Sequence, residues 1–514
     1  MSNTDYPSSV IIVKNITKAK EIKETHISYA ILGDEYVYKI KKPVDLGFLD
    51  YKLAKSRKLY TVLEKDLNDR FSDGIYIEAL KLVRQNATEF ALVSLDNSLT
   101  AIEYVLKMKR IPDEDFLQNR IEKGLITVCD MERIGKEVAL LLKNLEKAPK
   151  DEEFDTHFDV VKFNAEENFS QTQSYVGSLI DKDSFEYIKN QTLLFLNENK
   201  DLFNNRAMNS YVKNGHGDLR LEHIYFNSNK TVGLIDCIEF NKRFRFNDVI
   251  SEASFLSMEL DGMGRIDLSD GFLTGFLSVF NDEESRKLIN YYRCYLSYVR
   301  AKVTCFLVAS KDKSWELYND KQNEINKLID MSCMYAASLT NINLVFYGLM
   351  GTGKSKNAYN FSKRFPITLF SSDTIRKELA GISATNRQYI NWDTGIYSHE
   401  NSLNLYNKLG EMVAEKYKIG RVSLVDASFT KEEYITEYKK HNTCNIVFIE
   451  FDAPQEEITR RLQKRENSET ITDGRMEIAG KQRETAKMPA CDLKIITTGK
   501  VEDNIEKIYK FLIK

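Results

Sequence analysis

The clearest chemical pattern lies in the stretch 346-FYGLMGTGKSKNAY-359, which follows the apolar run Asn343–Tyr347 and precedes a helical pattern. It contains G-x-x-x-x-G-K-S, whose glycines let backbone N–H groups point at phosphate oxygens while the next helix adds its positive dipole end. The flanking strand and helix disfavour a glycine-rich turn without a ligand. We predict a nucleotide-binding loop made of Gly348, Leu349, Met350, Gly351, Thr352, Gly353, Lys354 and Ser355.

Charged side chains of this loop and of the next strand end have predicted roles. Lys354 is expected to reach the β- and γ-phosphates of ATP, and the Ser355 hydroxyl to help hold Mg²⁺. In FSSDTIRKELAG, Asp373 could accept the proton of an attacking hydroxyl and Arg376 could hold an anionic substrate, because parallel strands gather ligands at their C-terminal edge. The alternative is that Asp373 and the two preceding serines cap a helix.

Two later segments add further candidates. Asp426 ends the apolar strand in RVSLVDASF, which suits a second-sphere Mg²⁺ position, although a turn aspartate is the alternative. Arg461 and Arg465 lie four residues apart on a predicted helix, so both could reach one phosphate. The alternative for these arginines is a solvated helix face.

A second acidic pair lies much earlier in the chain. Asp218 in HGDLRLEHIYF and Asp236 in VGLIDCIEF are eighteen residues apart (236 − 218), each at the edge of an apolar run. Such a pair fits two roles: one carboxylate accepts the proton of a substrate hydroxyl, and the other binds the Mg²⁺ of ATP.

Lysines upstream of this pair complete a possible phosphate site. Lys39 and Lys41 alternate on one strand face, which would offer a lysine to the α- and β-phosphates. Glu64, on the helix that follows, is the expected partner that orients Lys39. The alternative is that both lysines are solvated residues of an edge strand.

The C-terminal motifs resemble a group of small P-loop kinases that includes zeta-toxin-like and polynucleotide-kinase-like enzymes. The G-x-x-x-x-G-K-S loop, SSDxxRK, DASF and RLxxR recur together there, and the resemblance spans about residues 343–510. It implies that Asp373 and Arg376 meet the phosphate acceptor and that Arg465 belongs to a lid helix. The segment TITDGRMEIAGKQ matches the usual lid only loosely.

The first half resembles the aminoglycoside-phosphotransferase-like kinases, a branch of the protein-kinase-like fold. The resemblance implies that Asp218 is the catalytic base and that Asp236 and His223 are metal ligands. His223 stands where that family normally has asparagine, and no glycine-rich loop precedes Lys39. The order of segments along nearly the full chain resembles bifunctional aminoglycoside phosphotransferase-like/ATP-binding proteins of bacteria.

The elements that must position these residues follow from hydrophobic periodicity. Alternation predicts a hairpin over 27–42, two strands over 91–111 and further strands near 223–240, with helices over 50–71, most of 112–210, 249–261 and 283–338. Strands then alternate with helices from 343 onward, which indicates a parallel sheet. We predict an α+β, two-lobed kinase-like domain (1–340, small lobe about 1–111) followed by an α/β parallel-sheet P-loop NTPase domain (341–514).

Composition limits the possible partners. Of 514 residues, 42% are hydrophobic and 29% are charged, which is ordinary for soluble globular domains. The net charge of −3 gives no general attraction to nucleic acid or anionic membrane. The seven cysteines show no paired spacing, and there is no signal peptide or long apolar window, so we expect a cytoplasmic chain without disulfides.

These patterns favour a phosphotransferase that uses ATP and Mg²⁺ and acts on the hydroxyl of a small metabolite. A different hypothesis makes the first half a ligand-sensing pseudokinase that regulates the P-loop half, because of His223 and the missing glycine-rich loop. A nucleic-acid end kinase is disfavoured by the net charge and by the lack of interleaved basic and aromatic patches. The pattern does not identify the acceptor.

Overall fold

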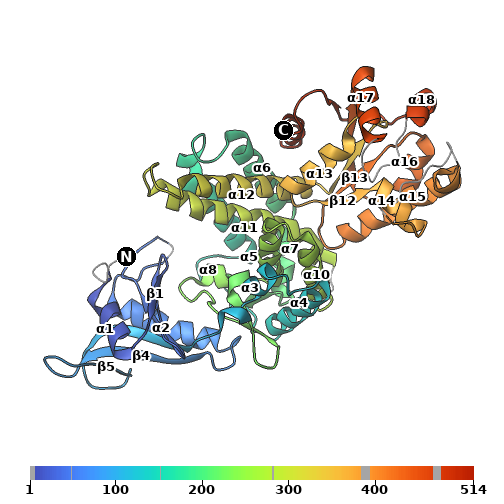
Figure 1. Cartoon of the computed structure of the whole chain (residues 1–514). Helices are drawn as coiled ribbons and strands as arrows, with labels where there is room; N and C mark the ends of the chain where they lie inside the picture. Colours follow the sequence, from blue (N-terminus) through green and yellow to red (C-terminus); the bar gives the residue numbers. More distant parts are fainter. Residues whose placement is uncertain (1–5, 48, 151, 281–282, 384–393, 467–475) are drawn as a thin grey trace. The chain divides into compact units, whose positions relative to one another are not determined.

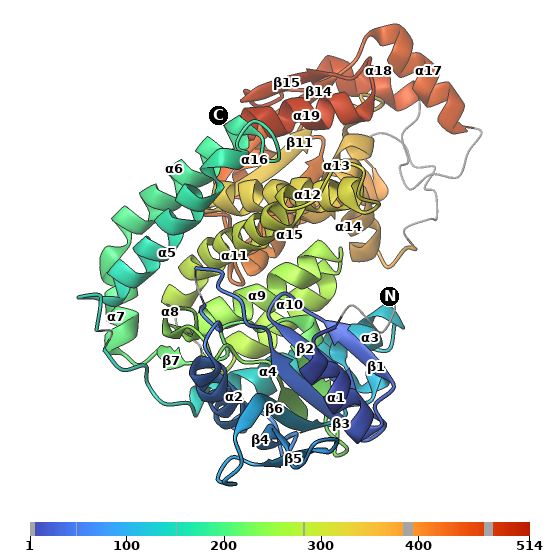
Figure 2. The ribbon, with the colours of Figure 1, turned by 90° about the vertical axis from the view of Figure 1, so that its left-hand side faces the viewer.

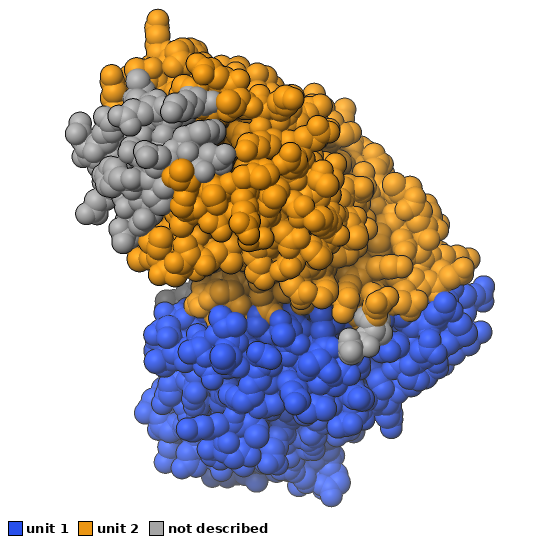
Figure 3. Space-filling view, turned by 90° about the vertical axis from the view of Figure 1, so that its right-hand side faces the viewer, with its two compact units in different colours: residues 1–157, 203–259, 271–280 blue, residues 158–202, 260–270, 281–514 orange. Residues whose placement is uncertain are grey.

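The computed structural model describes residues 6–47, 49–150, 152–280, 283–383, 394–466 and 476–514, and of these it leaves the side chains of 465, 466, 476–479 and 481 undescribed. The chain forms two compact units (Figures 1 and 3). Unit 1 contains residues 1–157, 203–259 and 271–280, and unit 2 contains residues 158–202, 260–270 and 281–514. Unit 2 therefore includes helices that precede residue 340, and the domain boundary near that residue stays a prediction.

Unit 1 is built on an antiparallel sheet of six strands in the order β1-β2-β3-β6-β4-β5. The strands are β1 (Glu21–Glu24), β2 (Ser28–Leu32), β3 (Tyr36–Lys41), β4 (Tyr76–Arg84), β5 (Phe90–Ser94) and β6 (Ala101–Lys109). The hairpin predicted over 27–42 and the two strands predicted over 91–111 are confirmed. Strands β1 and β4 were not predicted. β3 is an interior strand, because β2 pairs with one of its edges and β6 with the other.

The two faces of this sheet carry different helices (Figure 2). Helix α1 (Ser8–Thr17) packs on an apolar face that includes Ile40. Because side chains alternate along a strand, Lys39 and Lys41 point to the opposite face, where α2 (Ala54–Asn68) contacts β4 and β6. The buried stripe of α2 is polar and consists of Arg57, Thr61, Glu64 and Asn68.

The rest of the first half is mainly helical and carries a small hairpin at the acidic pair. Strands β8 (Ile224–Phe226) and β9 (Val232–Leu234) pair antiparallel between Asp218 and Asp236. The other elements up to residue 280 are η1 (Asp113–Asp115), α3 (Leu117–Glu122), α4 (Val128–Lys143), α5 (His157–Thr172), η2 (Gln173–Tyr175), α6 (Lys182–Glu198), α7 (Lys200–Met208), β7 (Val212–Asn214), η3 (Leu221–His223), α8 (Lys242–Arg245), β10 (Phe246–Asp248), α9 (Val249–Gly262) and α10 (Ile266–Leu277).

Unit 2 contains a parallel sheet of five strands in the order β12-β13-β11-β14-β15, which confirms the α/β class predicted for this part. The strands are β11 (Ile342–Tyr347), β12 (Thr368–Ser371), β13 (Ser423–Ala427), β14 (Asn445–Asp452) and β15 (Leu493–Ile496). The helices after residue 280 are α11 (Glu283–Ala309), α12 (Tyr318–Ser338), α13 (Lys354–Arg364), α14 (Ser372–Leu379), η4 (Gly395–Tyr397), α15 (His399–Tyr417), α16 (Glu432–Lys439), α17 (Gln455–Glu466), α18 (Met476–Thr485) and α19 (Val501–Leu512). Strand β15 was not predicted.

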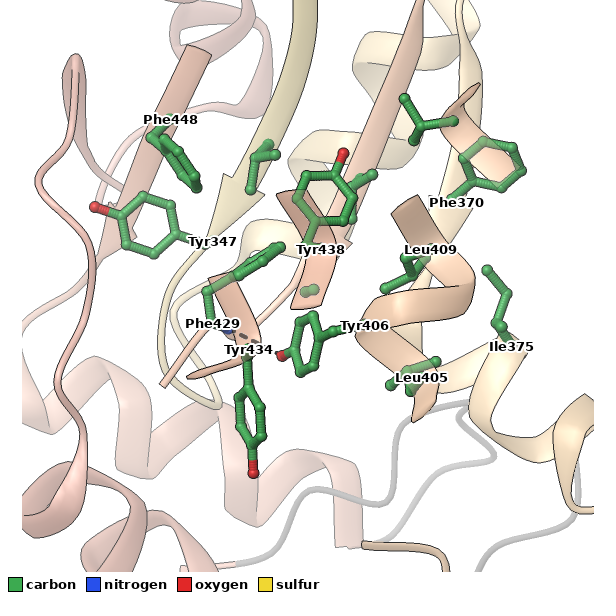
Figure 4. Packing of buried hydrophobic residues seen from close by; sticks show 14 residues of the cluster. Tyr347, Phe370, Ile375, Leu405, Tyr406, Leu409, Phe429, Tyr434, Tyr438 and Phe448 are labelled. Atoms are coloured by element: carbon green, nitrogen blue, oxygen red, sulfur yellow. Dashed lines mark hydrogen bonds between the residues drawn. The ribbon is translucent and has the colours of Figure 1, made fainter. Parts of the chain in front are cut away.

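The core of this sheet fixes which way Asp426 points. Val425 and Ala427 belong to the apolar cluster formed with α15 and α16, in which the Tyr406 hydroxyl accepts the N–H of Phe429 at 3.1 Å (Figure 4). Asp426 lies between them and therefore faces the other side of the sheet. Its register partner on β11 is Phe346, which packs edge-on against Phe361 of α13. Asp426 thus shares a face with the helix that begins at Lys354.

A buried ionic network holds the start of β13 in unit 2. The Arg421 guanidinium donates to Asp261 Oδ2 at 2.7 Å and to Asp270 Oδ1 at 2.8 Å. Lys416 donates to the other oxygen of Asp270 at 2.5 Å, and the Tyr335 hydroxyl donates to Asp261 at 2.7 Å. These partners come from three separate stretches of the chain, so the network joins residues 260–270 and α12 to the parallel sheet.

Two sequence-based exclusions can also be compared with the structure. All seven cysteines are free thiols, as expected from their spacing. Among the described residues, no helix is both long enough and apolar enough to span a bilayer.

Replacing Arg421 by alanine leaves two carboxylates buried without their main cation, and we expect the free energy of unfolding to fall by about 3–5 kcal/mol. Denaturant unfolding of the full chain, followed by circular dichroism, measures this. Lys408→Ala is the control, because Lys408 on α15 pairs with Glu411 on the exposed surface and its loss is expected to change stability little. Equal stability of the two variants would contradict the role assigned to the network.

Candidate functional site

The predicted phosphate loop is a tight turn between β11 and α13 that only glycine can form at three positions. Gly348, Gly351 and Gly353 have φ angles of +150°, +84° and +90°, which L side chains rarely adopt. A Cβ atom on Gly348 would also lie 2.3 Å from the carbonyl oxygen of Phe451. Gly353 is the N-cap of α13, so Lys354 is the first residue of that helix.

Four N–H groups of the turn lack an acceptor in the described part of the chain. Among the described residues, none accepts a hydrogen bond from the N–H of Gly351, Gly353, Lys354 or Ser355. Buried or partly buried N–H groups normally have a partner, and at a helix N-terminus that partner is often an anion. The turn therefore offers several aligned donors, together with the Lys354 ammonium, to a phosphate group.

Side chains from outside the turn hold its shape. Met350 donates its N–H to Gln482 Oε1 of α18 at 2.9 Å. Thr497, which follows β15, donates its hydroxyl to the carbonyl of Thr352 at 2.6 Å. Arg461 of α17 donates to the carbonyl of Gly351 at 3.3 Å and to the Thr497 hydroxyl at 2.9 Å. Arg461 thus supports the loop and is not part of a solvated helix face.

Asp373 follows β12 and Asp426 is the penultimate residue of β13, and these two strands lie on one side of β11. β12 ends at Ser371, and Asp373 lies in the first turn of α14. Ser371 is the N-cap of α14, but its side chain accepts no hydrogen bond from the helix. The structure therefore does not support Ser371 as a side-chain cap of this helix. Asp426 is buried and pairs in register with Ser371. Lys354, Asp373 and Asp426 are therefore placed at the same edge of the sheet.

The two remaining arginine predictions have different outcomes. Arg376 donates to the carbonyl of Ile396 at 2.8 Å and to Ser402 Oγ at 3.1 Å, and its guanidinium lies 4.8 Å from the ring centre of Tyr397. These contacts hold η4 against the start of α15, and the predicted grip of Arg376 on an anionic substrate stays a prediction. The side chain of Arg465 lies outside the described part of the chain.

A cavity of about 460 Å³ opens beside the last glycine of the loop. Its size falls within the range of small-molecule sites. The cavity is lined by Gly353, Lys356, Asn357, Arg460, Arg461, Thr497 and Asn504, among others. Sequence reasoning missed Thr497 and Asn504, because both follow the unpredicted strand β15.

In unit 1 the structure brings Lys39, Glu64 and Asp236 together. Lys39 Nζ lies 2.7 Å from Glu64 Oε1 and 2.5 Å from Asp236 Oδ1. Partial desolvation favours a higher pKa for Asp236, whose side chain is 45% exposed, but the neighbouring Lys39 ammonium outweighs it and lowers the pKa below the ordinary value. The alternative of solvated edge-strand lysines is wrong, because β3 is an interior strand and Lys41 is buried.

His223 lies between Asp218, the predicted base, and Asp236, a predicted metal ligand. Its Nδ1 is 2.8 Å from the carbonyl oxygen of Asp218, and its Nε2 is 3.7 Å from Asp236 Oδ2. Asp236 also has a φ angle of +65°, a conformation that costs energy for a residue with a side chain and that is common at functional sites. Asp218, His223 and Asp236 therefore form one cluster, although their predicted roles as base and metal ligands stay predictions.

Two glutamates of α9 that the sequence analysis missed hold the loop that carries Asp218. Glu252 Oε1 accepts the N–H groups of His216 at 2.7 Å and Gly217 at 2.8 Å. Burial raises the pKa of Glu252 to about 7, although these two N–H groups act in the opposite direction. Glu259 accepts from the N–H of Leu221 at 2.8 Å. The only signal in the sequence was the presence of acids inside an apolar helix.

The donor atoms at the P-loop suit Mg²⁺. Ser355 offers a hydroxyl and Asp426 a carboxylate, and Mg²⁺ prefers oxygen ligands completed by phosphates and water. At Asp236 the set departs from that chemistry, since Lys39 binds one carboxylate oxygen and His223 offers nitrogen. Within the described residues, no group of three or more His, Cys, Asp or Glu side chains could hold a metal. The metal roles of Ser355, Asp236, His223 and Asp426 stay predictions.

Comparison with known proteins supports the assignment of the P-loop part. Residues 344–489 match the family model described as an AAA domain. Uncharacterized proteins of Mycobacterium tuberculosis and Mycobacterium bovis are each 27% identical over 390 residues, which is 76% of this chain and 74% of theirs.

Two solved structures align with separate parts of the chain. An amicoumacin kinase in complex with AMP-PNP, Ca²⁺ and Ami covers 63% of this chain and 94% of its own, at 11% identity and a TM-score of 0.40. A sugar kinase of Janibacter sp. HTCC2649 covers 34% of this chain and 94% of its own, at 19% identity and a TM-score of 0.28. Residues 344–489 are thus similar to the AAA domain family, and their parallel sheet agrees with the α/β class predicted for this part.

Proposed function

We propose that this chain is a kinase that uses ATP and Mg²⁺ to phosphorylate a hydroxyl of a small molecule, with the chemistry in the P-loop part. The observation that carries the proposal is the edge of the parallel sheet. There Lys354 and Asp373 follow the ends of β11 and β12, Asp426 is the penultimate residue of β13, and nearby N–H groups have no acceptor in the described part of the chain. We assign phosphate binding to Lys354, the base to Asp373 and the support of the metal to Asp426, and phosphoryl transfer requires these three functions.

The first task of this edge is to bind and orient the triphosphate. Phosphate oxygens accept hydrogen bonds from the N–H groups of Gly351, Gly353, Lys354 and Ser355, which have no acceptor in the described part of the chain. Because these donors are already available, little reorganisation is needed during the reaction. The Lys354 ammonium stabilises the charge on the β- and γ-phosphates. A Mg²⁺ ion held by Ser355 and Asp426 would supply further neutralisation of that charge. The cavity beside Gly353 gives room for the nucleoside.

The second task is to activate the acceptor. Asp373 takes the proton of the acceptor hydroxyl while its oxygen bonds to the γ-phosphorus. The bond from that phosphorus to the β–γ bridging oxygen breaks, and ADP leaves with the electron pair. Arg376 and Arg465 are the proposed partners of anionic groups on this side of the site.

A small acceptor is favoured over a nucleic acid. The chain has a net charge of −3, and binding to a polyanion depends on phosphate contacts from clustered basic residues. Hydroxylated metabolites such as sugars, nucleosides and aminoglycosides are therefore the acceptors to test first.

Lys354→Ala should lower phosphate transfer from ATP by about 100-fold or more, because it removes the charge that stabilises the transferring group. Radiolabelled phosphate transfer to a panel of sugars, nucleosides and aminoglycosides measures it. Lys363→Ala, which removes a lysine from the far end of the same helix, is the control and should retain full activity. Equal activity of Lys354→Ala and Lys363→Ala would show that the P-loop is not the site of transfer.

Asp373→Asn tests the proposed base. The amide keeps the size of the side chain but cannot take a proton, so we expect kcat to fall by about 100-fold or more while the Kd for ATP stays unchanged. Steady-state kinetics with the best acceptor and calorimetric titration with ATP separate the two quantities. A parallel loss of ATP binding, or an unchanged kcat, would assign Asp373 a structural role instead.

A second candidate function concerns unit 1, which we propose as a nucleotide-binding regulator. Lys39 and Asp236 bind each other directly, and His223 lies where the related kinases use an amide. The β2–β3 hairpin has Gly33 as its sole glycine, so it lacks the glycine-rich cover over the phosphates. These features favour binding of a nucleotide without transfer.

In the full chain, this regulator hypothesis predicts that Lys354→Ala abolishes transfer yet still binds one nucleotide, whereas Asp218→Asn still transfers phosphate. Activity assays combined with the stoichiometry of ATP binding test both halves of that statement. If Lys354→Ala retained a transfer activity that Asp218→Asn removes, the first half would be an active kinase.

A further inference from the structure

Two lysines of β3 share one buried carboxylate. Lys39 Nζ lies 2.7 Å from Glu64 Oε1, and Lys41 Nζ lies 2.6 Å from Glu64 Oε2. The two lysines are two residues apart on a strand, so both point to the same face of the sheet. Glu64 is almost fully buried, with 1% of its surface exposed, and each of its oxygens therefore has its own cation.

The surroundings of the two lysines separate their roles. Lys41 is 3% exposed and already binds two carboxylates, because Glu239 is its second partner. The side chain of Lys39 is 16% exposed, and its second partner Asp236 has a carboxylate side chain that is 45% exposed. Lys39 thus lies on the solvent side of the cluster and Lys41 on the inner side.

The inner end of the cluster is anchored to the segment that follows Asp236. Glu239 accepts a hydrogen bond from the Tyr51 hydroxyl at 2.5 Å as well as the contact from Lys41. The Lys41 ammonium also lies 5.0 Å from the ring centre of Tyr51, which is itself fully buried. A continuous chain of buried partners therefore runs from Lys39 through Glu64 and Lys41 to Glu239.

Asn68, one turn after Glu64 on the same face of α2, also holds the segment that follows Asp236. Its side-chain oxygen accepts the N–H of Cys237 at 2.9 Å, and its amide donates to the carbonyl of Glu64 at 2.8 Å. The segment from Asp236 to Glu239 is thus held at Cys237 by Asn68 of α2, and at Glu239 by Lys41 and Tyr51.

We propose that Lys41 is a positioning residue of the unit 1 nucleotide site. It holds Glu64 and Glu239 in place, so that Lys39 alone is presented to the phosphates beside Asp236. The proposal rests on the nucleotide binding proposed above for unit 1. It assigns the phosphate contact to Lys39 and excludes Lys41 from it, although both lysines occur in the same short sequence pattern.

The experiment uses the full chain carrying Lys354→Ala, so that nucleotide binding reports on unit 1. In this background we expect Lys41→Met to weaken ATP binding by about tenfold, as is common when a group that orients a ligand contact is removed. Lys41→Arg, which keeps the charge, should restore part of the affinity. Lys42→Met is the matched control, because Lys42 lies next on the chain and pairs with Glu24 instead of Glu64.

A second measurement separates positioning from general stability. An adenosine analogue with a sulfonyl fluoride reacts with a lysine amine near the phosphates and releases fluoride, and mass spectrometry locates the label. We expect the label on Lys39 and none on Lys41, with slower labelling of Lys39 in Lys41→Met. Where Lys41→Met fails to fold, Tyr51→Phe takes its place, because it removes only the hydroxyl that holds Glu239, and it should also weaken ATP binding.

The possible outcomes separate the positioning role of Lys41 from the proposed nucleotide binding of unit 1. Labelling of Lys41, or unchanged ATP binding and labelling in Lys41→Met and Tyr51→Phe, would overturn the positioning role while leaving the nucleotide site intact. Absence of any ATP binding in the Lys354→Ala chain would overturn the nucleotide site of unit 1 itself, and the role of Lys41 with it.

Discussion

The P-loop part depends on backbone N–H groups that the protein leaves without acceptors. A helix cannot satisfy its first N–H groups internally, and the turn before α13 contains Gly351 and Gly353, whose N–H groups also have no acceptor among the described residues. Such a turn would be costly if it were buried against apolar side chains. It is kept in shape by contacts with its carbonyls, from Arg461 and Thr497, which leave the donors available. An anionic ligand is the partner that completes this arrangement.

In unit 1, by contrast, the charged side chains near Asp236 pair with one another. Lys39, Lys41, Glu64, Asp236 and Glu239 form a set of ion pairs in which each ammonium contacts two carboxylates and each carboxylate contacts at least one ammonium. Burying charges in this manner is tolerated only when each is paired, because desolvation is expensive. The set contains three carboxylates and two ammonium groups, so it carries a surplus negative charge that a cation brought in with a ligand would offset.

The sequence was sufficient where the chemistry is local. The glycines and Lys354 of the phosphate loop have fixed spacing, and Gly33 with its alternating neighbours marked the first hairpin. It was insufficient where position depends on distant pairing. The interior place of Lys39 follows from β6, which joins β3 after an intervening helix and two strands. Thr497 and Gln482 reach the phosphate loop only through the folded sheet, and Glu252 looks like any polar residue of a helix until its N–H partners are known.

The contrast between the two halves has a consequence for binding. At the P-loop, four N–H groups have no acceptor in the described part of the chain, so none of their hydrogen bonds there has to break before a nucleotide binds. A nucleotide that contacts both Lys39 and Asp236 must first separate a direct ion pair that is 2.5 Å long, which subtracts from its affinity. Glu64 lessens that loss, because it remains bound to Lys39 after Asp236 has been released. Because Lys41 keeps its ion pairs with Glu64 and Glu239, the ion pair between Lys39 and Asp236 can separate while both buried glutamates keep a cation.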